Sequence, residues 1–175
     1  VPLDDHVVSA IRSLGEVTVI IAPNNYHHLY LRGAMEHFPH ATVWAAPGLP
    51  AKRKDLAFLQ TLGPGASPPW AAQLKPLFLA GAPKMDETVF LHRASRTLIV
   101  TDSVFNITQV RGPLSKTMFR LMGSFGGPAQ GRIWRSVVAD RAAMATSTRA
   151  VLAEDFDRLI MAHGDVINTG GRSVL

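Results

Sequence analysis

The sequence predicts a layered α/β protein in which helices cover a mixed β-sheet. Short apolar runs typical of buried strands alternate with stretches in which apolar residues recur at helical spacing. Two of these runs, 88–91 and 97–101, are separated by only five residues and are typical of an antiparallel hairpin, so the sheet is mixed rather than purely parallel. The chain has 175 residues, of which 47% are hydrophobic, which is enough for one domain spanning 1–175 with its own core.

The amino-terminal part contains the clearest strand-then-helix unit. Asp4 and Asp5 predict the start of a first helix that ends at Gly15 and whose apolar face is formed by Val7, Val8, Ile11 and Leu14. Residues 17–22, VTVIIA, are mostly β-branched and predict a buried strand that ends at Pro23. A second helix is then predicted from the spacing of Leu31, Ala34, Met35 and Phe38.

The middle of the chain predicts a second strand, a long loop and the hairpin. Residues 42–46 form the strand, which Pro47 and Gly48 end. Residues 47–76 are rich in Pro and Gly and predict a surface loop, and loops of this length in compact domains are often functional. A short strand is expected at 77–79, directly before the hairpin.

The carboxy-terminal part predicts two helices and a last strand. Met118, Leu121 and Met122 indicate a helix within 104–131, and Gly-Gly-Pro at 126–128 indicates a loop. Residues 140–153 are rich in Ala with few helix breakers and predict a second helix. The apolar run 159–162 then predicts the last strand.

Composition narrows the classes of partner. The absence of Cys excludes disulfides and thiolate metal sites and fits a reducing, cytoplasmic compartment. No apolar run approaches the ~20 residues of a membrane span, so no membrane partner is expected. The net charge of +5 permits acidic partners, but basic residues are scattered apart from 52–54, so nucleic acid is not the expected partner. The first residue is not Met and no leader is visible, so an incomplete amino terminus is expected.

Residues able to bind a metal ion follow three of the predicted strands. His27 and His28 come soon after the strand 17–22, Asp102 follows 97–101, and His163 follows 159–162. Ligands of layered α/β proteins bind at the carboxyl ends of strands, and imidazole and carboxylate suit zinc, iron or manganese. The pattern therefore predicts one metal site at three strand ends in one small sheet. The alternatives are a helix-capping or exposed His, an N-cap Asp and a satisfied core His.

Four segments carry a resemblance to a known family: APNNYHHLYL, AAPGL with KRKDL, ETVFLHRASRTLIVTDSVFN and DFDRLIMAHGDVI. With these segments the sequence resembles the metallo-β-lactamase fold superfamily, and within it the family known as domain of unknown function 4336. The resemblance implies an αββα sandwich of metallo-β-lactamase type with mixed sheets and a metal centre at one sheet edge. It also implies that strands which normally precede the first helix are missing from this sequence.

The superfamily's metal-binding motif is only partly present. Its H-x-H-x-D-H pattern falls on Pro23, Asn25, His27 and His28, so that two His are replaced and His27 stands in place of the Asp. The His that usually precedes the hairpin has no counterpart, its nearest match being Gly81-Ala82. The resemblance therefore implies that one metal site has lost its private ligands, while the other keeps His27, His28, Asp102 and His163.

These residues predict a single-metal hydrolase of ester, lactone or thioester type that uses one divalent ion, zinc or iron. Asp102 and Asn25 are the expected catalytic residues, with Asn24 or Asn25 positioning water or substrate. The alternative is a non-catalytic binding or structural module that kept the fold, and nucleic-acid processing is a weaker third class.

A small-molecule substrate is expected, and the loop 47–76 is expected to cover it as a lid. Trp70 of this loop can contact an organic ligand, and Lys52, Arg53 and Lys54 can bind an anionic group. The alternative is that Trp70 packs in the core and that the basic residues are merely solvated. The sequence leaves the oligomeric state open.

Overall fold

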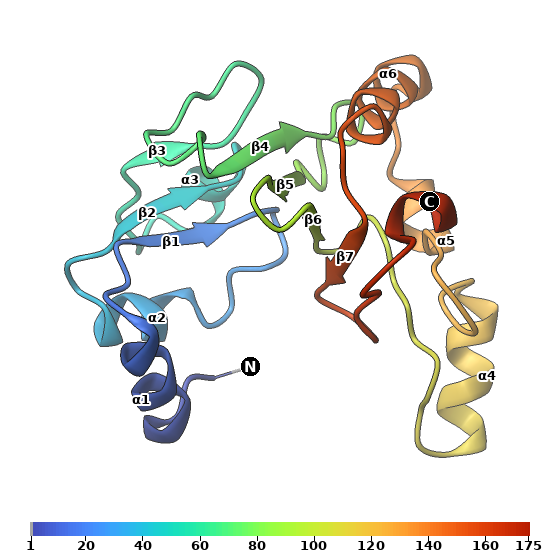
Figure 1. Ribbon diagram of the computed structural model, residues 1–175, viewed down its shortest axis with the longest axis horizontal. Coiled ribbons are helices and arrows are strands. Elements are labelled where there is room, and N and C mark those ends of the chain that lie inside the picture. Colours follow the sequence, from blue (N-terminus) through green and yellow to red (C-terminus); the bar gives the residue numbers. More distant parts are fainter. Residues whose placement is uncertain (1) are drawn as a thin grey trace.

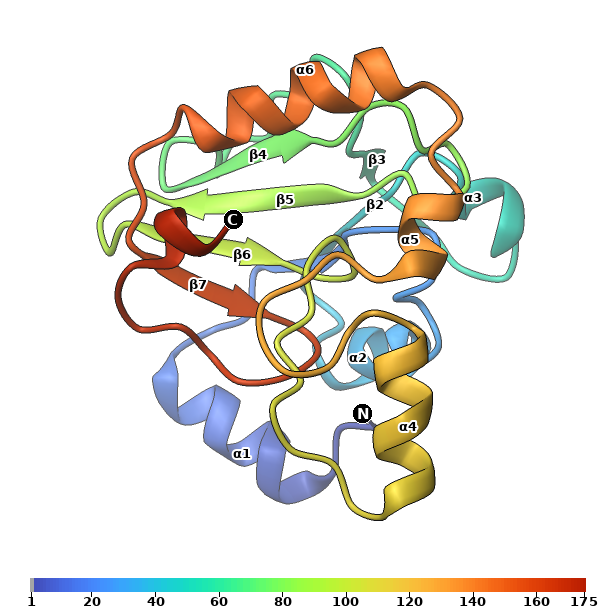
Figure 2. The ribbon, with the colours of Figure 1, turned by 90° about the vertical axis from the view of Figure 1, so that its right-hand side faces the viewer.

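Two β-sheets lie face to face in the computed structural model, which describes residues 2–175, and helices cover their outer faces (Figures 1 and 2). The first sheet is parallel, in the order β1 (Val19–Ala22), β2 (Thr42–Ala45), β3 (Gln60–Thr61). The second has the order β4 (Leu74–Phe78), β5 (Thr88–His92), β6 (Thr97–Val100), β7 (Arg158–Met161). In it β4, β5 and β6 are antiparallel neighbours, and β7 pairs in parallel with β6. The predicted αββα sandwich and the hairpin are therefore confirmed.

The helices divide between the two outer faces in chain order. α1 (Asp5–Leu14), α2 (Leu31–His37) and α3 (Leu49–Lys52) lie on the side of the three-stranded sheet (Figure 1). α4 (Pro113–Leu121), α5 (Arg132–Ser136) and α6 (Arg141–Leu152) lie on the side of the four-stranded sheet, with the short η1 (Gly171–Val174) in front of β6 and β7 (Figure 2). Among the described residues, no helix has the length and apolar character needed to cross a membrane.

Alternation along the strands produces three separate apolar layers. Side chains between the sheets include Trp44 and Phe90, joined by Val19, Ile21, Leu62 and Ile99. Their sequence neighbours point outward and pack against the helices: Ala22, Val43 and Ala45 on one side, and Val89, Leu91, Leu98 and Val100 on the other. Because both faces of each central strand are covered, these strands are continuous apolar runs in the sequence rather than alternating ones.

Two predicted helix starts are confirmed by their capping bonds. The Asp4 side chain accepts a hydrogen bond from the Val7 N–H at 2.8 Å, and Asp140 Oδ1 accepts from the N–H groups of Ala142 and Ala143 at 2.9 and 3.0 Å. These carboxylates satisfy backbone donors that have no partner inside the helix.

The expectation that the three ligand-bearing strands share one sheet is wrong. β1 belongs to the first sheet, while β6 and β7 belong to the second. The chain crosses between the sheets directly after β1, because the Pro23 carbonyl accepts from the Thr88 N–H at 2.9 Å and the Asn25 N–H donates to the Met85 carbonyl at 2.9 Å. Sequence periodicity indicates which residues form strands but does not indicate which strands pair.

The expectation that residues 47–76 form one loop is also wrong. The segment contains α3, β3 and the first residues of β4, which begins at Leu74 rather than at 77. Pro76 lies inside β4, which is possible because β4 is an edge strand whose outer side needs no hydrogen-bond donor.

Trp70 packs between the sheets and does not act as a lid. Its ring lies 5.7 Å from that of Trp44 in an edge-to-face arrangement and 6.0 Å from that of Phe90. Aromatic pairs in this geometry are favourable beyond the area that they bury. Trp70 therefore helps to join the two sheets.

We expect the substitution Trp70→Ala to lower the free energy of unfolding by about 2–3 kcal/mol, since the side chain is half-buried and full truncation of a buried Trp costs ~3–5 kcal/mol. Urea unfolding followed by far-UV circular dichroism measures the change. Leu59→Ala, in the same segment but at a 59% exposed side chain, is the control and should change the value by less than about 0.5 kcal/mol. Equal effects of the two substitutions would contradict this packing role.

Candidate metal centre

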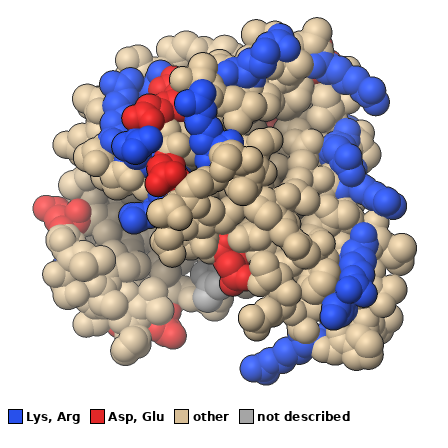
Figure 3. All heavy atoms as spheres, turned by 45° about the vertical axis from the view of Figure 1, so that its right-hand side comes forward, with Lys and Arg blue, Asp and Glu red and all other residues tan. Residues whose placement is uncertain are grey.

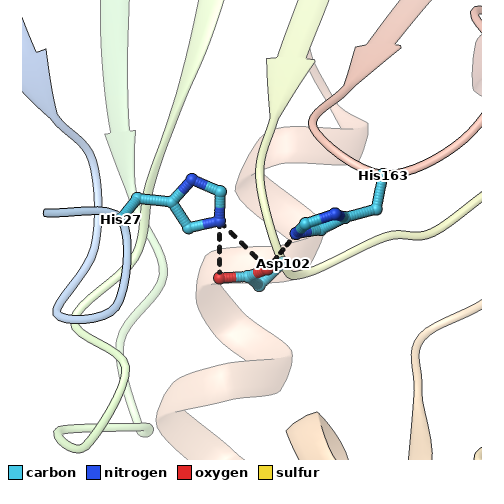
Figure 4. Close-up of side chains that lie close together, drawn as sticks. All are labelled: His27, Asp102 and His163. Atoms are coloured by element: carbon cyan, nitrogen blue, oxygen red, sulfur yellow. Dashed lines mark hydrogen bonds and ion pairs between the residues drawn. The ribbon is translucent and has the colours of Figure 1, made fainter. Parts of the chain in front are cut away.

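Three side chains from three strand ends converge on one point. His27 Nε2 lies 3.2 Å from Asp102 Oδ2, and His163 Nε2 lies 3.1 Å from Asp102 Oδ1 (Figure 4). One ligand atom from each of the three residues lies within 4.8 Å of the others. The Asp102 side chain is 13% exposed, whereas those of His27 and His163 are 29% and 43% exposed. The structure therefore brings together three of the four predicted metal ligands at a site that solvent can reach.

The register of β6 and β7 places Asp102 beside His163. Val100 pairs with Met161 in this parallel ladder, so the residues two positions further along each strand also come side by side. His27 reaches the same point from the first sheet, through the turn that follows β1 (Figure 4).

The turn that carries Asp102 is held by the buried carboxylate of Glu87. Oε1 of this side chain accepts hydrogen bonds from the backbone N–H groups of Thr101, Asp102 and Ser103 at 3.0, 3.1 and 3.2 Å, and from the Ser103 hydroxyl at 2.9 Å. Its Oε2 accepts from the Trp134 indole N–H at 3.2 Å. Glu87 is fully buried, so these donors replace the water that the carboxylate has lost.

Asn24 connects the His27 turn to Asp102. Its amide N–H₂ donates to Asp102 Oδ2 at 2.7 Å and to Thr101 Oγ1 at 3.0 Å. Its side-chain oxygen accepts from the N–H groups of Tyr26 and His27, both at 2.9 Å, which is the geometry of an Asx turn. Asn24 is therefore a positioning residue that sets both His27 and the Asp102 carboxylate.

The charges within the cluster support one another. Burial alone would raise the pKa of Asp102, but hydrogen bonds from His163, His27 and Asn24 outweigh it and hold the pKa of this carboxyl well below its usual range. The hydrogen bond to Asp102 raises the pKa of His27 above its ordinary value, against the opposing effect of burial. Asp102 is therefore a carboxylate at neutral pH, as a metal ligand must be.

The position of His163 depends on the glycine that follows it. Gly164 has φ = +112°, and a Cβ at this residue would lie 2.1 Å from the Asn106 carbonyl oxygen. The Asn106 N–H in turn donates to the His163 carbonyl at 3.0 Å. The Phe105 ring stacks on the His163 imidazole, with centroids 5.2 Å apart and planes inclined by 12°. Residues 105–106 thus fix the orientation of the imidazole.

The structure places His28 outside this group. Its Nδ1 lies 3.0 Å from Arg53 Nη1, which also donates to the His28 carbonyl at 2.9 Å. Burial, together with the charges of Lys52 and Arg53, lowers the pKa of His28. Two adjacent side chains in this turn therefore point to different neighbours, and only His27 reaches Asp102.

Asn25 also lies apart from Asp102. Its amide N–H₂ donates to Asp86 Oδ2 at 3.1 Å and to the Pro83 and Lys84 carbonyls at 3.4 Å. A Cβ at Gly48 would lie only 2.7 Å from the same amide. Asn25 thus holds the turn before β5, and its neighbour Asn24 makes the contact with the cluster.

The cluster forms one wall of an open cavity of about 350 Å³. The other walls are mainly apolar. They come from the turn before β5, the segment after β6, the end of α4, and α5: Met85, Phe105, Phe119, Met122, Ile133 and Trp134. None of the lining residues comes from 47–76, so the expectation that this loop covers the site is wrong. Lys52 instead donates to the Asn25 carbonyl at 2.8 Å, and Arg53 binds His28.

The residues at this point fit one divalent metal ion. Two imidazole nitrogens and one carboxylate form a donor set found in zinc and non-haem iron sites, which keep further positions open. The positions that the sequence resemblance matched to a second metal site offer no such donors. Pro23 has none, Asn25 binds the turn at 83–86, and Ala82 is buried in the apolar layer under α5 and α6.

Sequence reasoning missed two residues that build the site, Glu87 and Phe105. The signal for Glu87 was an acidic residue directly before the apolar run 88–91, because a carboxylate there is drawn into the core with the strand. No local pattern distinguishes Phe105, whose role depends on the position of His163.

Comparisons with known proteins identify the family and the fold. The sequence model of a family described as "Domain of unknown function (DUF4336)" matches residues 5–118. No curated protein shows a significant match to the sequence.

The structure is similar to solved metallo-β-lactamases. A metallo-β-lactamase from Pontibacter korlensis matches with a TM-score of 0.61 at 14% sequence identity. The match covers 97% of this chain and 72% of the metallo-β-lactamase chain. DIM-1 metallo-β-lactamase has a TM-score of 0.58 at 15% identity, covering 99% and 78%. TMB-1 has a TM-score of 0.58 at 13% identity, covering 93% and 67%. Similarity at this low identity shows a shared fold.

We expect the substitution Glu87→Gln to lower the free energy of unfolding by about 2–3 kcal/mol, because an amide replaces a buried carboxylate that accepts several hydrogen bonds. Urea unfolding measures the change. Glu36→Gln, at an exposed position of α2, is the matched control and should alter the value by less than about 0.5 kcal/mol. If Glu87→Gln left the free energy of unfolding unchanged, the 101–103 turn would not depend on the carboxylate.

Proposed function

The chain belongs to the DUF4336 family, a domain of unknown function with the metallo-β-lactamase fold, and from its site we propose that it is a single-metal hydrolase acting on an ester, lactone or thioester. The observation that carries the proposal is the convergence of His27, Asp102 and His163 on the wall of an open cavity. Donors that meet in a concave, largely apolar site are the usual setting of a small-molecule active site.

Each ligand residue has a defined part in holding the ion. His27 and His163 present Nε2 to the cluster, so Nδ1 carries the proton when these atoms bind a metal. Asp102 offers the carboxylate between them, and Asn24 holds one of its oxygens in place. A divalent ion bound here, zinc or iron, supplies Lewis-acid polarisation of water and of a carbonyl oxygen.

Other residues hold the ligands ready and give the cavity an apolar side. The stacked Phe105 ring keeps the His163 imidazole in one orientation, and the low pKa of Asp102 keeps its carboxylate available for the ion rather than for a proton. Trp134 and Met85 are buried and add apolar surface to the cavity, which would lower the local dielectric constant around a reacting bond.

A non-catalytic binding module is the second candidate, and one observation favours it. Asp102 is already paired with His27, His163 and Asn24 through direct hydrogen bonds, so the cluster is satisfied by protein groups alone. Nucleic-acid processing has less support, because the ligands of a second metal site are missing. The net charge of +5 permits an acidic partner, and Figure 3 shows Lys and Arg side chains in a row along one side of this face.

We expect the protein purified without chelator to contain about one equivalent of zinc or iron. His163→Ala should lower the affinity for zinc by more than ~100-fold, because loss of a ligand exceeds the 10–100-fold loss typical of outer partners. His28→Ala should retain the metal, since His28 faces Arg53. Elemental analysis and zinc titration of both variants measure this.

The outcomes of the metal experiment are distinct. If His28→Ala lost as much metal as His163→Ala, His28 would be a fourth ligand. This result would contradict the three-ligand assignment. A wild-type protein that takes up no metal even on titration would contradict the metal centre itself.

We expect metal-dependent turnover in a panel of esters, lactones and thioesters assayed with added zinc, manganese or iron. Asp102→Asn should abolish it, and Asn24→Ala should lower it by about 10–100-fold, because Asn24 orients the Asp102 carboxylate. His92→Ala, at the end of β5 and outside the cavity lining, is the control and should leave turnover unchanged. If the metal-loaded protein turned over none of these substrates, the result would favour the non-catalytic binding module.

A further inference from the structure

The shape and chemistry of the cavity indicate what kind of substrate enters it. We infer that the substrate is an ester or thioester of a hydrocarbon acyl group, which lies in the cavity with its carbonyl end at His27, Asp102 and His163. This inference rests on the proposed hydrolase and specifies the substrate of the same site.

Besides His27, Asp102 and His163, the cavity lining has few polar groups, among them the phenol of Tyr26, the residue directly before His27. Among the residues that line it, Asp102 is the only acidic one and none is Lys or Arg. Ser124, a further polar residue, is buried, and its hydroxyl donates to the Phe119 carbonyl at 3.4 Å. A ligand that fits this lining has one polar end and an otherwise apolar body.

The apolar wall begins directly at the cluster. Phe105 stacks on His163, so a chain leaving the reacting carbonyl meets an aromatic ring first. Phe119, Met122 and Ile133 continue this wall. Methionine adapts its shape to irregular apolar ligands, which suits a flexible hydrocarbon better than a rigid polar one.

The volume and the exposure of the wall also fit an acyl chain. The cavity of about 350 Å³ lies at the lower end of the ~300–1,000 Å³ range of small-molecule sites. Ile133 is 61% exposed, and Phe119 and Met122 are half-buried. These side chains therefore keep apolar surface in contact with water. A hydrocarbon that covers this surface removes it from water, and the hydrophobic effect favours its binding.

Acyl-chain length is the variable that tests the inference. The p-nitrophenyl esters from acetate to octanoate are assayed with the zinc-loaded protein. The kcat/KM is expected to rise about threefold to fourfold for each added methylene until the cavity is filled, as burial of a methylene predicts. A kcat/KM that stays constant or falls along the series would overturn the inference.

Matched substitutions locate the effect in the cavity. Ile133→Glu places a charge on the wall and should lower the kcat/KM for octanoate by at least about tenfold. Leu114→Glu makes the same change at an 83% exposed position of α4 that does not line the cavity, and should leave the octanoate value unchanged. Equal effects of the two substitutions would contradict the assignment of the wall.

A binding measurement separates this inference from the proposed reaction. Octanamide, which is uncharged, is titrated calorimetrically into metal-free and zinc-loaded protein. Binding that Ile133→Glu removes, without turnover of any ester, would support the acyl site and contradict the hydrolase. Turnover that is independent of chain length, without octanamide binding at millimolar concentration, would support the hydrolase and overturn the acyl site.

Discussion

The hydrogen bonds of Glu87 are the interaction on which the candidate site depends. A fully buried carboxylate is costly unless its lone pairs are satisfied, and here three consecutive backbone N–H groups and a hydroxyl bind one of its oxygens. This requirement forces the chain after β6 into a tight turn around Glu87 and leaves the Asp102 side chain on the cavity side. The other oxygen binds Trp134, so the same residue also fixes one wall of the cavity.

The site lies across the two halves of the sandwich. His27 comes from the end of the first sheet, whereas Asp102 and His163 come from neighbouring strands of the second. Asn24 joins them through its hydrogen bond to Asp102, and the aromatic contacts of Trp44, Trp70 and Phe90 hold the sheets together. The distance between His27 and Asp102 therefore depends on inter-sheet packing as well as on the turns that carry the two residues.

Most of the apolar cavity wall comes from residues 104–139, whose conformation depends on tertiary contacts more than on local sequence. Residues 104–139 contain five Lys and Arg residues, no Asp or Glu, and apolar side chains without one clear period. Only short elements form here, α4 and α5, connected by turns at glycines such as Gly123 and Gly126, both with positive φ. Phe105 and Trp134 attach the segment to the site through His163 and Glu87, so its role depends on tertiary contacts rather than on local preference.

The sequence by itself determined most of the strands, the two capped helices, and the strand ends that carry the candidate ligands. These features follow from local physics, namely apolar periodicity, carboxylates at helix starts, and prolines or glycines where strands end. Tertiary structure decided that His27 rather than His28 meets Asp102, that Asn24 rather than Asn25 supports it, and that Trp70 packs between the sheets. In each case the deciding contact joins segments far apart in the chain, for which local sequence preference carries no information.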